Sequence, residues 1–179
     1  MIETGLECPH LPPDDLNRTL SFAQPDGDGT LPHIGLVGDT YTITVAGNDT
    51  NDRFCVIDMH IPPGGGPGPH RHDFEETFIL LDGEIEVIFR GKKSTVRAGA
   101  TVNIPSNAPH QFHNISSRPA RMICVCSPAG NERFFLEIGV PVATRTTAPP
   151  TMDEKQMAEF LEKAKALAPK YHTELLDQV

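Results

Sequence analysis

The sequence has little positive charge, no long apolar run and few cysteines, and each shortage excludes a class of protein. Its 15 Lys and Arg residues are outnumbered by 24 Asp and Glu residues, which gives a formal charge of -9, and they form no basic cluster. An acidic surface repels phosphate groups, so a nucleic-acid partner is not expected. The longest apolar run is far shorter than the roughly 18 residues that a membrane span requires. Residues 1–10 lack a basic segment followed by an apolar stretch, so we expect no secretory signal and a soluble, cytoplasmic protein.

The four cysteines are too few for a disulfide scaffold, and they include no CxxC pair. We therefore expect reduced thiols. Cys124 and Cys126 are two residues apart in an apolar run, so both side chains are predicted to lie on one face of a strand as small hydrophobic residues. A metal-binding role for this pair is the alternative.

Gly and Pro are abundant instead, with 15 and 17 residues, which indicates many turns and little room for long helices. Short segments with strand character recur between these turns, and 179 residues suffice for one domain. This spacing favours an all-β sandwich or barrel. The strands are expected at residues 41–46, 54–61, 76–81, 84–89, 101–104, 110–115 and 121–126.

Both ends of the chain differ from this β body. Residues 1–36 are rich in Pro, Asp and Gly and are predicted to form an arm, which leaves the barrel at 37–140 and a linker at 141–150. Over 151–179 we expect a helix and a tail, with Thr151 and Glu154 forming a capping box. An apolar stripe at helical spacing is predicted to dock this helix on the barrel or on a second subunit; it consists of Met157, Phe160, Leu161, Ala164 and Leu167.

The dipeptide Asp82-Gly83 lies between two apolar segments and is typical of a two-residue β-hairpin turn. It predicts a hairpin whose pairing continues to Glu76 opposite Phe89. One face then carries the Glu76 carboxylate among apolar side chains that we expect to line a ligand pocket, namely Phe78, Leu80, Ile85, Val87 and Phe89. We expect the arm, the C-terminal helix or a dimer partner to cover part of the other face, which carries Thr77, Ile79, Leu81, Glu84, Glu86 and Ile88.

Residues of the types that bind metals gather just before this turn. His70 and His72 are two apart, so both imidazoles project from one face of an extended chain, and Glu76 shares their parity. A carboxylate on an apolar face is costly to bury unless a cation neutralises it. His110, which opens a strand after a Pro-rich turn, is the candidate fourth ligand. Such a set suits one divalent transition-metal ion and leaves open whether it is Fe, Mn, Ni, Co, Cu or Zn.

Two neighbouring residues are not expected to join this site. Glu75 and His113 have the opposite parity to Glu76 and His110, so we predict that both point away from it.

These residues resemble the two sequence motifs of the cupin superfamily. The match consists of His70, His72, Glu76 and Gly83 for the first motif, and of Gly99, Pro105, His110 and Asn114 for the second. Asn107 replaces a Gly of the second motif. Because Asn adopts positive φ more readily than most residues, we expect the turn to survive this exchange.

The resemblance implies a cupin jelly roll, which is a double-stranded β-helix barrel, here with an N-terminal arm and a C-terminal α-helix. Residues 38–41 and 128–135 are similar to single-domain quercetinase-type cupins. That similarity implies a homodimeric, metal-dependent dioxygenase whose partners are dioxygen and a flavonol or other enolisable aromatic substrate. His70, His72, Glu76 and His110 would hold the ion, and Glu76 would loosen its metal bond to take the substrate proton. The alternative is a non-oxidative cupin, either an isomerase or lyase or a small-molecule-binding module with the same metal site.

Overall fold

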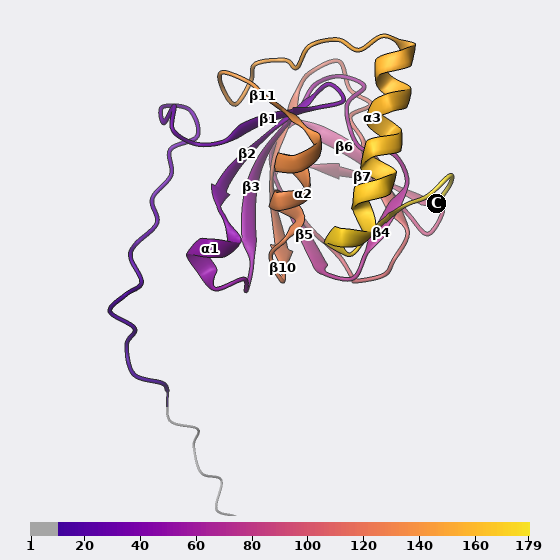
Figure 1. The fold of residues 1–179 in the computed structure, drawn as a ribbon. Coiled ribbons are helices and arrows are strands. Elements are labelled where there is room, and N and C mark those ends of the chain that lie inside the picture. Colours follow the sequence, from indigo (N-terminus) through magenta and orange to yellow (C-terminus); the bar gives the residue numbers. More distant parts are fainter. Residues whose placement is uncertain (1–10) are drawn as a thin grey trace, which may run out of the picture.

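Two antiparallel β-sheets face each other across one core in the computed structural model, which describes residues 11–179 (Figure 1). The larger sheet has the strand order β11-β1-β2-β3-β10-β5-β8, and the smaller sheet has the order β12-β4-β9-β6-β7. The chain therefore passes repeatedly between the two sheets, as in a jelly roll. The all-β prediction is confirmed.

The larger sheet consists of β1 (His33–Leu36), β2 (Asp39–Val45), β3 (Cys55–Ile61), β5 (Glu75–Asp82), β8 (Thr101–Ile104), β10 (Ala120–Ser127) and β11 (Val140–Pro141). The smaller sheet consists of β4 (His70–His72), β6 (Glu84–Phe89), β7 (Lys92–Arg97), β9 (His110–His113) and β12 (Thr173–Leu175). The helices are α1 (Gly47–Thr50), α2 (Asn131–Ile138) and α3 (Glu154–Leu167), followed by a short 3-10 helix at Ala168–Tyr171. All seven expected strands are present. The additional strands are short or, like β7, too polar to show alternation.

The core forms between the sheets because the inward side chains are apolar. On β10 every second residue is buried, and the four that point inward, Ala120, Met122, Cys124 and Cys126, are at most 1% exposed. The prediction that both cysteines lie on one face of a strand is confirmed.

The predicted hairpin around Gly83 is wrong. β5 pairs with β8 and β10 in the larger sheet, whereas β6 pairs with β7 and β9 in the smaller sheet. The chain crosses between sheets at Gly83, which has a φ of 76°, and a Cβ there would lie 2.9 Å from backbone atoms of Pro119 and Ala120. A tight turn and a crossover both need a residue at positive φ, so the dipeptide does not distinguish them.

The faces predicted for these strands are nevertheless right, because alternation decides which side chains point inward whatever the partner strand is. The inward residues Glu76, Phe78, Leu80, Ile85 and Val87 are buried, and Phe89 packs partly buried against them. On the outer face, neither the arm nor the C-terminal helix covers the described residues Ile79 and Leu81, which are 38% and 48% exposed.

The C-terminal helix begins later than predicted. Asp153 caps it by accepting a hydrogen bond from the Gln156 backbone N–H, and the Gln156 side chain accepts one from the Asp153 N–H. The expected cap, Thr151, lies before the helix. Figure 1 shows α3 beside α2 at one side of the barrel, after which the chain adds β12 to the edge of the smaller sheet next to β4. The helix therefore docks on the barrel.

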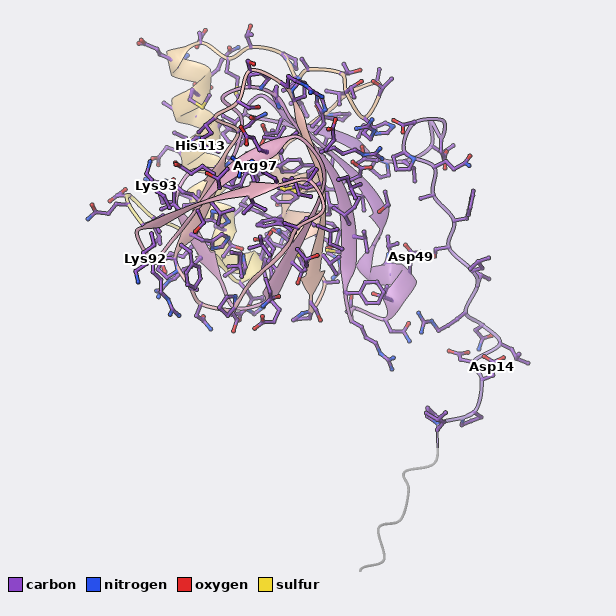
Figure 2. The ribbon with its side chains drawn as sticks, turned by 180° about the vertical axis from the view of Figure 1, so that it is seen from behind. Asp14, Asp49, Lys92, Lys93, Arg97 and His113 are labelled. Carbon is purple, nitrogen blue, oxygen red and sulfur yellow. The ribbon has the colours of Figure 1, made fainter. Side chains whose placement is uncertain are left out.

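Residues 11–32 extend away from the barrel as an arm (Figures 1 and 2). Arg18 donates a hydrogen bond to the Asp49 carbonyl, and Arg145 donates one to the Asp26 carboxylate. The last residues of the expected arm form β1, which pairs with β2 and β11. None of the helices formed by residues 11–179 has the length and apolar character needed to cross a membrane.

Candidate metal centre

Three strands of the barrel bring four side chains together. His70 and His72 lie on β4, Glu76 lies on β5 and His110 lies on β9, so the set draws on both sheets. Each side chain offers one nitrogen or oxygen atom, and these four atoms all lie within 4.8 Å of one another. His72, Glu76 and His110 are at most 4% exposed, and His70 is partly exposed. The four residues singled out in the sequence are thus neighbours in space.

Backbone contacts of two turns fix the positions of these strands. His70 lies directly opposite His110 in the β4–β9 pairing. In the loop before β4, Gly66 has a φ of 124°, and a Cβ there would lie 2.1 Å from the Phe112 carbonyl oxygen. Asn107 has a φ of 65°, as expected from the sequence, and its N–H donates to the His72 carbonyl at 2.6 Å. Both ligand-bearing strands are therefore held by these turns.

The three imidazoles are oriented by backbone carbonyls. Each Nδ1 lies 2.9 Å from a carbonyl oxygen, and the acceptors are those of Gly68 for His70, Phe74 for His72 and Ala108 for His110. A carbonyl only accepts, so each Nδ1 carries the proton in these contacts. In the neutral imidazoles the Nε2 lone pairs are then free for a metal ion.

The Glu76 carboxylate faces two of these nitrogens. Its Oε2 lies 3.2 Å from Nε2 of His72 and 3.1 Å from Nε2 of His110. Burial acts to raise the pKa of Glu76, but the hydrogen bonds from His110 and His72 outweigh it and hold that pKa well below its usual range. These contacts require either protons on the two Nε2 atoms or a cation among the three atoms, and one divalent ion would replace both protons.

Burial, reinforced by the neighbouring His110, lowers the pKa of His70 to about 4. His70 is therefore neutral near pH 7, as a metal ligand must be. Three imidazoles and one carboxylate are donors of intermediate softness that suit the six ions named from the sequence. The residues present thus fit a divalent transition-metal ion.

A cavity of about 430 Å³ adjoins the site. His70, His72 and Glu76 form part of its wall. The rest is mainly apolar and comes from the first strands, α2, α3 and the C-terminal tail, including Tyr41, Met59, Phe134, Phe135, Phe160 and Leu161.

The predicted pocket residues do not line this cavity. Among the described residues, Phe78, Leu80, Ile85, Val87 and Phe89 are absent from its walls and belong to the core instead. The Phe78 ring packs edge-on against Phe112, which does reach the cavity. The prediction is wrong because it assumed that the two strands pair beside the ligand, whereas they lie in opposite sheets and fill the space between them.

Asp39 is a cavity residue to which the sequence analysis assigned no role. It is 2% exposed, its Oδ2 accepts a hydrogen bond from the Tyr41 hydroxyl at 3.0 Å, and its Oδ1 accepts one from the Gly66 N–H at 3.2 Å. Burial raises the pKa of Asp39 to about 7. A carboxylate two positions from a Tyr, on a strand that is otherwise apolar or Thr-rich, was the available signal.

Two thiols also lie against the centre. The Cys124 thiol donates a hydrogen bond to Glu76 Oε1 at 3.2 Å, and the Cys126 sulfur lies 4.0 Å from the same oxygen. Cys55, Cys124 and Cys126 are free thiols, while Cys8 lies outside the described residues. Strand alternation predicted that both β10 cysteines point inward, but it could not predict that they face Glu76.

The residues of opposite parity lie outside the site. Glu75 is exposed and accepts hydrogen bonds from the Asn103 side chain and the Ser106 N–H. His113 is on the outer side of the smaller sheet, where Figure 2 labels it together with Lys93 of β7.

Comparisons with known proteins agree with this geometry. The family model described as "Cupin domain" matches residues 57–126. The chain is similar to quercetin 2,3-dioxygenase of Bacillus subtilis, with 27% identity over 124 residues that cover 64% of this chain and 36% of that protein. It is also similar to the polyketide synthase CurC of Streptomyces cyaneus, with 33% identity over 67 residues that cover 37% of this chain and 44% of that protein. The chain thus spans less than half the length of either relative.

Among solved structures, the chain is similar to an RmlC-like cupin from Shewanella frigidimarina. The TM-score is 0.51 and the identity 16%, and the match covers 64% of this chain and 99% of that one. At this identity the similarity concerns the fold.

The metal centre can be tested by comparing variants of two histidines on one strand. We expect Zn(II) at roughly a hundredfold excess over its Kd to stabilise the native chain by about 3 kcal/mol, measured by thermal unfolding. His110→Ala should reduce this stabilisation, because it removes a ligand of the histidine site. His113→Ala, on the outer side of the same strand, should preserve it. Equal stabilisation of the two variants would contradict the proposed ligand set.

Asp39 should make stability depend on pH. Because its folded pKa of about 7 exceeds the ordinary value of 3.8, the folded state binds the proton more tightly. The stabilisation that protonated Asp39 gives to the folded state is complete below the ordinary pKa. It is lost as the pH rises to about 7, by about 1.4 kcal/mol per pH unit or about 4 kcal/mol in all. We expect Asp39→Asn to flatten the urea-denaturation stability of the metal-free protein across this range. Parallel pH curves for the variant and the native chain would exclude the effect.

Proposed function

Because this chain is a member of the cupin superfamily, we propose that it is a metal-dependent dioxygenase of quercetinase type that acts on a flavonol or another enolisable aromatic compound. The observation that carries the proposal is the cluster of His70, His72, Glu76 and His110, of which the first three line an apolar cavity. The similarity to quercetin 2,3-dioxygenase supports the substrate class.

One divalent transition-metal ion is the proposed cofactor, held by Nε2 of His70, His72 and His110 and by the Glu76 carboxylate. Such an ion would supply Lewis acidity toward a substrate hydroxyl and a centre for oxygen activation. The chain's own contribution is to keep the three imidazoles in one orientation through their Nδ1–H bonds to backbone carbonyls.

Glu76 is the proposed catalytic base. It is a cavity residue, and its low pKa keeps it ionised at neutral pH. Loosening the contacts that lower this pKa would make Glu76 a stronger base toward a substrate hydroxyl. Its Oε1 is already held by the Cys124 thiol, so Oε2 is the oxygen that faces the histidines. Proton transfer at Oε2 would leave the Cys124 contact in place.

The cavity suits a flat apolar molecule. A volume of about 430 Å³ falls within the range of roughly 300–1,000 Å³ that is usual for small-molecule sites. Phe112, Phe134 and Phe135 supply aromatic surfaces for stacking. Lys165 is the sole lysine or arginine among the described residues that line the cavity, so a phosphate group would find little positive charge there.

A non-oxidative reaction is the second candidate, and Asp39 is the observation that favours it. An isomerase or lyase needs groups that give and take a proton at neutral pH. Asp39, with a pKa of about 7, could exchange a proton at the cavity wall while Glu76, which also lines the cavity, acts as a second group. Product formation without oxygen consumption would select this candidate.

The oxygenase proposal can be tested by comparing variants of two adjacent glutamates. With the metal-loaded protein, we expect oxygen uptake with quercetin and none with the corresponding flavone that lacks the 3-hydroxyl group. Glu76→Gln should lower kcat by about 10² to 10⁴, because it removes the base. Glu75→Gln, on the outward-facing neighbour, should leave kcat unchanged. An oxygen electrode measures both. If several loaded metals give no uptake with any flavonol, the oxygenase assignment fails.

A second copy of this chain is the proposed protein partner. Ile79 and Leu81 are exposed on the outer face of the larger sheet, and the arm presents Leu16, Leu20 and Phe22 at 77–93% exposure. Since neither α3 nor the arm covers that face among the described residues, a two-fold dimer would give both apolar surfaces a partner.

Light scattering after size exclusion tests the dimer. We expect twice the chain mass of 19.5 kDa for the native protein. Leu81→Glu should shift the mass toward the monomer, since it places a charge on the proposed interface. Leu136→Glu, an equally exposed leucine on α2, should leave the dimer intact. A monomeric native protein would refute the proposal.

A further inference from the structure

Behind Glu76, on the side away from the histidines, lies a group of buried thiols. Cys124 and Cys126 point inward from β10, and Cys55 is paired with Cys126 across the β3–β10 register. All three are 0% exposed. In the proposed reaction Cys124 only holds Glu76 Oε1, and Cys55 and Cys126 have no part.

Three ligand atoms in this group lie at spacings that suit one ion. The sulfurs of Cys124 and Cys126 are 3.5 Å apart, and they lie 3.2 and 4.0 Å from Glu76 Oε1. An ion bound tetrahedrally at about 2.3 Å from sulfur and about 2.1 Å from oxygen places its ligand atoms about 3.6–3.8 Å apart. Small side-chain movements would therefore bring all three atoms into the first coordination sphere of one ion.

The geometry points to a second metal site, formed by Cys124, Cys126 and Glu76 Oε1, which takes a soft, thiophilic ion such as Cu(I), Zn(II) or Cd(II) and shares Glu76 with the histidine site. Thiolate ligands select such ions, whereas the imidazole and carboxylate set accepts a wider range. The two carboxylate oxygens face opposite ways, Oε2 toward His72 and His110 and Oε1 toward the thiols.

Binding at this second site balances in protons and charge. Each thiol that becomes a ligand releases one proton to solvent, so a divalent ion displaces two. The ion and two thiolates then carry no net charge, and the Glu76 carboxylate adds one negative charge, which it shares with the histidine site. Asn131 lies between this site and the cavity, because it lines the cavity and its Nδ2 lies 3.5 Å from the Cys126 sulfur, so an entering ion would have to displace this side chain. The site does not depend on the reaction proposed above, because it concerns binding alone.

Cadmium titration of the full-length, metal-free chain tests the inference, with Cys8→Ser as the background because Cys8 lies outside the described residues. We expect two equivalents of Cd(II) to bind, accompanied by a cadmium–thiolate charge-transfer band in the ultraviolet. In the Cys124→Ser/Cys126→Ser variant, one equivalent and the whole band should be lost. In His110→Ala, one equivalent should be lost and the band retained.

Cys55→Ser is the matched control, since it replaces a third buried cysteine that is not an assigned ligand and should keep both equivalents and the full band. Thermal unfolding in a chelator shows that each variant is folded, and Cys124→Ser alone replaces the double variant if that one unfolds. Absence of the band, its persistence in the serine variant, or its loss in Cys55→Ser would overturn the assignment. A single equivalent that both His110→Ala and the serine variant abolish would also overturn it, because it would mean one mixed site.

Discussion

A buried carboxylate held against two imidazole nitrogens is the interaction on which the rest of the site depends. Glu76 is 4% exposed, and its Oε2 faces His72 and His110 at little more than 3 Å. Because backbone carbonyls occupy the Nδ1 protons of those rings, the Nε2 atoms need additional protons or a cation to face an ionised oxygen. A divalent ion satisfies all of these atoms at once. The burial of one charged group in this place is therefore the strongest physical argument for a metal in this fold.

The barrel makes that arrangement possible by drawing ligands from both sheets. The chain crosses from the smaller sheet to the larger one between β4 and β5, so Glu76 belongs to the larger sheet while the histidines of β4 and β9 belong to the smaller one. Close backbone contacts fix the position of β4 relative to β9 within the smaller sheet. Gly66 packs against the Phe112 carbonyl, and the Asn107 N–H reaches the His72 carbonyl. Side chains larger than hydrogen at Gly66 would separate the loop from β9 and disturb the ligands.

The alternation of residues along single strands was enough to predict much of the site. The rest depends on pairing between strands that are distant in the sequence. Alternation placed Glu76 inward and Glu75 outward correctly, because parity along a strand does not depend on its neighbours. The same reasoning failed for the partner of β5, since a Gly at positive φ serves a hairpin and a sheet crossover equally well. The cavity walls were not predictable for a related reason. They come from β2, α2 and α3, which approach the ligands only in the folded chain, as Asp39 and Phe134 illustrate.

The proposed ligands and much of the remaining cavity wall come from separate parts of the chain. The proposed ligands lie between residues 70 and 110, inside the barrel, whereas α2, α3 and the tail up to Asp177 supply much of the surface that a bound molecule would touch. Sequence change in the C-terminal segment can therefore reshape what fits beside the ion while the coordinating atoms stay where the sheets hold them. Selectivity and coordination can thus diverge independently, and a single scaffold could accept new substrates through changes to the residues from Asn131 onward.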